Sequence, residues 1–180
     1  MAGVYFGGQQ IYKPGAYSQV DASGMVPISL GGQRVLAIIG SATGTEDSPL
    51  EYNRIYWFNN PSQARKVLGS GDLLVGAEMA WSGGNDVGAD LIACVPLETD
   101  ETTGEPTTEA WANALALLET EPIDGIIPMS DEATVHAQVK EHISSLSGTT
   151  RRRERRGFFG HALGEESTAV QERVASLGTH

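Results

Sequence analysis

The sequence predicts an α/β protein: a three-layer core in which helices cover both faces of one sheet, preceded by an extended N-terminal arm. Short, continuous apolar runs of strand length recur along the chain. These runs alternate with amphipathic helical patterns, which is typical of a largely parallel sheet. The first 33 residues lack helical periodicity and are rich in Gly, Gln and Ser. We therefore expect an arm over residues 1–33 and an α/β core over residues 34–180.

The strands of the predicted sheet are apolar runs bounded by breakers. Residues 35–40, 91–97 and 125–129 have the length and composition of buried parallel strands, and residues 158–163 form a weaker fourth run. The alternation stops at His180, where a further strand should begin. We expect a missing C-terminal segment to complete the sheet.

The predicted helices have capping signals at their ends, and each has one apolar face. Asn60 and Pro61 suit an N-cap and first turn, and Gly69 suits the C-terminal stop. Ser130 suits a cap before the acidic pair Asp131 and Glu132. The later helices, over residues 72–82, 108–120, about 130–146 and 166–177, have these expected buried residues: Leu73, Ala77, Ala80 and Trp81; Trp111, Ala114, Leu115 and Leu118; Val135, Val139, Ile143 and Leu146; Val170, Val174 and Leu177.

Charge is distributed unevenly along the 180 residues. The net charge of −11 disfavours nucleic acid as a main partner. Residues 151–156 nevertheless carry a net charge of +4, so the remainder carries −15. We expect a solvated helix end or loop, a contact with nucleic acid, or an intersubunit charge patch formed by Arg151, Arg152, Arg153, Arg155 and Arg156. The acidic stretch 98–109 is interpreted as a solvated loop or as a face that meets those arginines in another copy.

The sequence offers weak support for chemistry. The loop 40–49 follows a strand but lacks the glycine and lysine pattern of a phosphate-binding loop. His136 and His142 do not have the spacing that lets two histidines on a helix share a metal ion. Ser130, Asp124 and Asp131 have ordinary explanations as cap, turn and first-turn residues, and Cys94, the single cysteine, lies mid-strand among apolar neighbours. We expect no catalytic residue, no cofactor and no metal ion. The chain has no apolar run long enough to cross a membrane or to act as a secretory signal, so we expect a soluble protein that folds in a cytoplasm.

Several segments together resemble one family. They are residues 12–17 (YKPGAY), 34–43 (RVLAIIGSAT), 61–69, 72–84 with 90–95, and 115–130. In order and spacing they resemble the N-terminal half of the tail sheath proteins of contractile phages and prophages.

The resemblance implies a structural subunit, not an enzyme. Such a subunit polymerises helically around a tail tube and contracts to drive the tube through the host envelope. The implied partners are other sheath subunits, the tail tube and the baseplate, without nucleic acid and without direct membrane insertion. The implied location is the virion tail, assembled in the bacterial host cytoplasm. A sheath-like subunit of a bacterial injection device would fit equally well.

The arm is expected to pair with a neighbouring subunit as an added strand. Its expected contact residues are Tyr5, Phe6, Tyr12, Pro14, Gly15 and Tyr17. The alternative for this segment is a poorly ordered terminus. The alternative for the whole chain is a small-molecule or nucleotide-binding α/β domain.

Overall fold

A computed structural model describes residues 4–6, 9–11, 35–82, 89, 91–100, 102–147, 154–162 and 164–177. The chain divides into two units, residues 1–32 and 33–180, which are described separately.

The first unit contains an antiparallel pair of short strands. β1 (Val4–Phe6) pairs with β2 (Gln9–Ile11), with Val4 opposite Ile11. Two residues, Gly7 and Gly8, separate the strands in the sequence, a connection typical of tight hairpins. This part of the predicted arm therefore pairs with itself. Tyr5 and Phe6 lie in β1, whereas Tyr12, Pro14, Gly15 and Tyr17 lie outside the described residues.

In the described part of the second unit, five strands form one sheet. They are β3 (Val35–Gly40), β4 (Tyr56–Phe58), β5 (Leu91–Pro96), β6 (Gly125–Pro128) and β7 (Arg156–Gly157). Their order across the sheet is β4-β5-β3-β6-β7. β5, β3, β6 and β7 are parallel, and β4 runs antiparallel to β5 along one edge.

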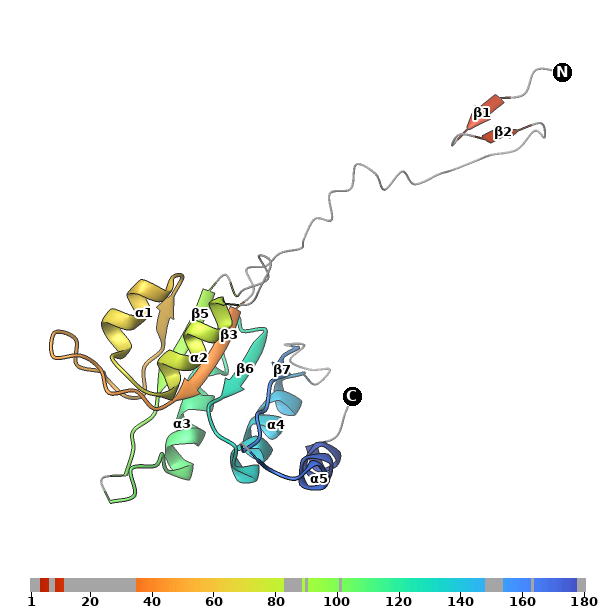
Figure 1. Cartoon of the computed structure of the whole chain (residues 1–180). Helices are drawn as coiled ribbons and strands as arrows, with labels where there is room; N and C mark the ends of the chain where they lie inside the picture. The colour runs from red at the N-terminus through yellow and green to blue at the C-terminus, as the bar shows by residue number, and fades with distance from the viewer. Residues whose placement is uncertain are drawn as a thin grey trace. The chain divides into compact units, whose positions relative to one another are not determined.

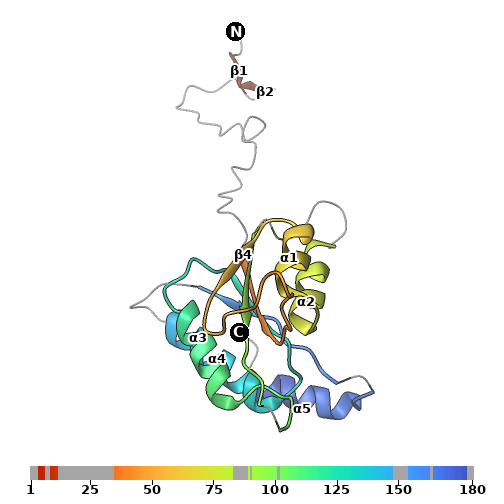
Figure 2. The ribbon, with the colours of Figure 1, turned by 90° about the vertical axis from the view of Figure 1, so that its left-hand side faces the viewer.

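Helices cover both faces of this sheet (Figures 1 and 2). α1 (Pro61–Leu68) and α2 (Asp72–Trp81) connect β4 to β5 on one face, whereas α3 (Thr108–Leu118) and α4 (Ala133–Ser147) lie on the other. The chain runs from β3 to β5 in one direction across the sheet. It then runs back across β3 to β6 in the opposite direction. Connections of one hand must then place their helices on opposite faces. α5 (Ser167–Leu177) lies beside α4.

The central strand shows why both faces are apolar. Val35, Ala37 and Ile39 pack into the core beneath α3 and α4, whereas Ile38 packs into the core beneath α1 and α2. Alternate side chains of a strand point to opposite faces, so a strand covered on both sides must be apolar throughout. The predicted α/β class and its sandwich of layers are confirmed.

The helix ends also follow the sequence signals. The Asn60 side chain accepts a hydrogen bond from the Gln63 amide at 2.9 Å, and Gly69 ends α1 with φ of +69°. Ser130 accepts from the Glu132 amide at 3.2 Å, although α4 begins only at Ala133. The expected buried faces of α2, α3 and α4 are confirmed: Leu73, Ala77, Trp111, Ala114, Leu115, Leu118, Val135, Val139 and Leu146 are buried, and Ala80, Trp81 and Ile143 are partly buried against the cores.

Three expectations about this unit need correction. The weak strand predicted at residues 158–163 lies instead at Arg156–Gly157, because the ladder beside β6 starts there. β4 was not predicted, although its aromatic sequence YWF is typical of a strand. α5 forms where expected but has no buried residue, and Val174 is 48% exposed; the helix packs beside α4.

Candidate assembly surfaces

The loop after β3 does not form a phosphate site in the described structure. Its amides are already donated to carbonyl groups of the same fold: Thr43 to Ser70 at 2.8 Å, Gly44 to Leu68 at 3.1 Å and Thr45 to Ser48 at 3.2 Å. A phosphate-binding loop needs such amides to be free and convergent. The first two bonds hold the loop against the end of α1 and the residues that follow it, and the third closes a turn within the loop.

The crevice beside this loop is filled as well. In sheets of this order, ligands bind at the carboxyl ends of the two strands where the chain changes direction across the sheet, here β3 and β6. Met129, which follows β6, occupies that position: a Cβ added to Gly40 would lie 2.9 Å from its Cβ, and one added to Gly76 would lie 2.7 Å from its Sδ. The two glycines therefore accommodate a packed methionine.

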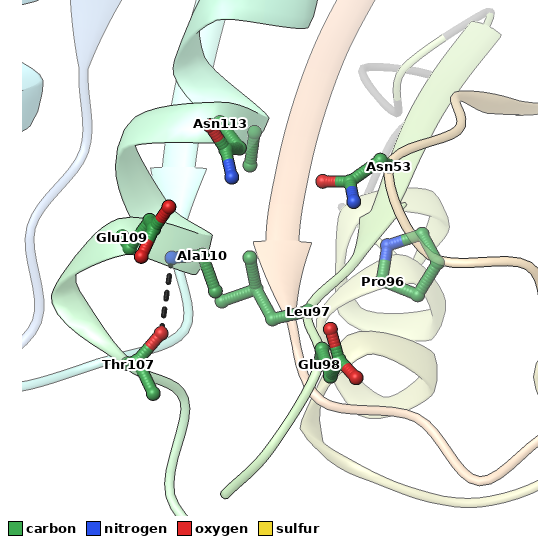
Figure 3. A pocket seen from close by; sticks show the side chains of 9 residues that line it. Asn53, Pro96, Leu97, Glu98, Thr107, Glu109, Ala110 and Asn113 are labelled. Atoms are coloured by element: carbon green, nitrogen blue, oxygen red, sulfur yellow. Dashed lines mark hydrogen bonds between the residues drawn. The ribbon is translucent and has the colours of Figure 1, made fainter.

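A small cavity lies at the carboxyl end of β5, next to the start of α3 (Figure 3). Its volume is about 250 Å³, and Asn53, Glu98, Glu109 and Asn113 are among the residues that line it. This is smaller than most ligand pockets, which hold roughly 300–1,000 Å³. The two carboxylates also disfavour phosphate or another anion.

The polar residues weighed for chemistry have structural partners. Burial raises the pKa of the Cys94 thiol to about 12, so the thiol stays protonated and unreactive at neutral pH. His136 is fully buried, where its Nε2 lies 2.8 Å from the Ser130 carbonyl oxygen and its ring packs against Phe159. His142 Nε2 lies 3.0 Å from Arg155 Nη1. Among the described residues, no group of three or more His, Cys, Asp or Glu is placed to hold a metal ion, and no helix could cross a membrane.

Two of the three most exposed large apolar side chains among the described residues lie on the outer face of α2. Met79 is 67% exposed and Val75 is 49% exposed. Both line a groove of about 500 Å³ between α1 and α2, which Trp81 also borders and whose rim holds the ion pair Arg65–Glu78. Apolar groups grouped on a surface mark protein contacts. The signal in the sequence was that α2 has apolar residues off its buried stripe as well as on it.

Arg155 does not belong to a surface patch. It is 6% exposed, and its Nη2 donates to the carbonyl oxygens of Leu118 at 2.7 Å, Glu121 at 2.6 Å and Glu119 at 3.3 Å. These carbonyls lie at and just beyond the C-terminal end of α3, where the helix dipole attracts a cation. Arg155 thus makes its hydrogen bonds within its own fold, which corrects the expectation that it faces another copy.

The other charged segments stay on the surface where they are described. Arg156 is exposed, whereas Arg151, Arg152 and Arg153 lie outside the described residues. The acidic loop is ordered by Asp100, whose Oδ1 accepts from the amides of Thr103 at 3.0 Å and Thr102 at 2.8 Å. These two bonds, of which the one from Thr103 has the larger effect, hold the pKa of the Asp100 carboxyl below its usual value.

Comparisons with known proteins found relatives of parts of this chain. A tail sheath protein of Bacillus phage SP01 is 29% identical over 142 residues, which are 74% of this chain and 24% of that protein. A tail sheath protein of Staphylococcus phage Twort is 33% identical over 98 residues, 54% of this chain and 16% of that protein. A relative in Enterococcus phage phiEF24C is 35% identical over 82 residues, 46% of this chain and 14% of the relative.

These relatives confirm the resemblance to the tail sheath family. No family model matches the chain. Since 74% of the chain matches 24% of the SP01 protein, the chain spans about a third of that protein's length. This is less than the half that the resemblance implied.

Proposed function

We propose that the chain is part of a tail sheath subunit that polymerises helically around a tail tube and contracts to drive the tube through the host envelope. The observation that carries this proposal is the similarity to a phage tail sheath protein over 142 residues. The proposed partners are other sheath subunits, the tube and the baseplate. The proposed location is the virion tail, after assembly in the host cytoplasm.

The outer face of α2 is the surface of the core that we assign to contact between subunits. Burying a side chain such as Met79 contributes about 1.5–3 kcal/mol per copy. A helical array repeats each contact at every subunit, so a weak contact is sufficient to stabilise a long polymer.

The N-terminal segment supplies the second proposed contact. Its candidate residues remain Tyr5, Phe6, Tyr12, Pro14, Gly15 and Tyr17. Residues 12–34 separate the β1–β2 hairpin from the core, and 23 residues can extend to roughly 75 Å. Such a length suits a link to another copy. The proposed charge patch is reduced to Arg151, Arg152, Arg153 and Arg156, because Arg155 is buried.

The experiment that tests this proposal is sedimentation of the full-length gene product. The wild-type protein is expected to pellet as polymer, and Met79→Asp is expected to reduce the pelleted fraction at least tenfold while the monomer keeps its circular dichroism spectrum. Ala112→Asp is the matched control, because it adds the same charge to an exposed helix position, on α3 and not on α2. A wild-type protein that never pellets would overturn polymerisation. A Met79→Asp protein that pellets like wild type would overturn the assignment of α2.

A further inference from the structure

Asp124 sits where the N-terminal segment enters the core. Val35 is the first described residue of the second unit and the first residue of β3. The Val35 amide donates to Asp124 Oδ2 at 2.9 Å, and the Asp124 amide donates back to the Val35 carbonyl oxygen at 3.0 Å. One residue therefore holds both main-chain polar groups of Val35.

The same residue joins a third strand. The Asp124 carbonyl oxygen accepts from the Arg156 amide at 2.9 Å, at the start of β7. The paired residues of β3 and β6 begin only one position later, at Leu36 opposite Gly125. Val35 therefore lies one position before the paired residues of β3 and β6, and its amide bonds to the Asp124 carboxylate in place of a main-chain carbonyl of β6.

β3 is the strand best placed to carry a load. It is central, with six paired positions to β5 and four to β6. Tension on residues 1–34 enters the core at Val35. If Val35 were held loosely, the strand would peel residue by residue from its end. With Val35 fixed on Asp124, all the bonds along β3 share the load.

We propose that Asp124 fixes the root of the N-terminal segment, so that force arriving along this segment is carried by the centre of the sheet. This inference rests on the proposed role of the segment as a link between subunits. It adds the residue that would make such a link mechanically sound. The Asp124 side chain acts as a hydrogen-bond acceptor for the Val35 amide, so Asn at this position retains much of the stabilisation.

Hydrogen exchange on the full chain tests the root directly. Asp124→Ala is expected to accelerate exchange of the Val35 amide about tenfold relative to the Ile38 amide, because one charge-assisted bond is lost locally. Asp124→Asn is expected to lie between Ala and wild type. Asp100→Ala is the matched control, since it removes a carboxylate that accepts two backbone bonds in a loop away from β3. Unchanged exchange at Val35, or equal acceleration at Val35 and Ile38, would overturn the proposal.

Force measurement tests the mechanical part. With handles at the two ends of the full chain, Asp124→Ala is expected to unfold at lower force than wild type, and Asp100→Ala at the wild-type force. Equal forces for all three proteins would overturn the inference. Sedimentation of the same variants separates this outcome from the proposed function. If Asp124→Ala unfolds at lower force than wild type but the wild-type protein never pellets, the role of Asp124 is supported and polymerisation is refuted.

Discussion

Replacement of Arg155 by Ala tests how the chain holds its last parallel strand. Besides its contact with His142 Nε2, the guanidinium makes two short bonds, to the carbonyl oxygens of Leu118 and Glu121, and a longer one to that of Glu119. Charge-assisted bonds contribute about 1.5–3 kcal/mol each, and the cost of burying the guanidinium offsets part of that sum. We expect Arg155→Ala to lower the free energy of unfolding by about 3 kcal/mol.

Urea denaturation followed by circular dichroism measures this loss. With a slope of about 2 kcal/mol/M, the midpoint is expected to fall by about 1.5 M, and the melting temperature by about 6–12 °C. The matched control is Arg156→Ala, which removes an exposed arginine one position away and is expected to change stability by less than about 0.5 kcal/mol. If the two variants unfold within about 0.5 kcal/mol of each other, the reasoning about Arg155 is wrong.

Two further predictions concern backbone and thiol. Gly69→Ala is expected to destabilise the fold by more than about 3 kcal/mol in thermal unfolding, because φ is +69° and the added Cβ would overlap the Gly44 carbonyl oxygen. Gly104→Ala, at φ +74° with nothing within 4 Å, should cost only about 1 kcal/mol, and equal losses would contradict the role given to the close approach. Cys94 should resist a disulfide reagent at pH 8 until urea unfolds the chain, since its pKa is raised to about 12 from 9.0. Because the pKa of the Cys94 thiol is raised on folding, its protonated form stabilises the fold fully below pH 9, and this stabilisation is lost as pH rises toward 12. Rapid labelling of Cys94 in the native protein would refute both the expected resistance to the reagent and this pH dependence.

Much of the core could be predicted because its signals are local. Val35–Gly40 and Leu91–Pro96 are apolar throughout, and such runs have few solutions other than a strand covered on both faces. The cap at Asn60 depends on neighbours within three residues. The order of the strands in the sheet was not predicted, because several orders are compatible with alternating strands and helices and same-handed connections.

The remainder depends on contacts between distant residues. Arg155 reads as part of a basic run, yet its partners lie 34–37 residues earlier, at the end of α3. Val174 follows a helical stripe that looked buried, but periodicity cannot say how much of a stripe the fold covers.

The candidate surfaces were predicted least well. Met79 lies off the buried stripe of α2, and only its 67% exposure identifies it. Exposed apolar residues scattered along a sequence are common, and only their grouping in space indicates a contact.

Electron microscopy of the assembled full-length gene product, followed by helical reconstruction, tests most directly whether this chain is part of a sheath. We expect striated tubes of uniform width, in which the β4-β5-β3-β6-β7 sheet and its helices fit a density that repeats around a central tube, with the outer face of α2 against a neighbouring copy. Compact monomers under all assembly conditions, or tubes into which this α/β body cannot be fitted, would contradict the proposed function.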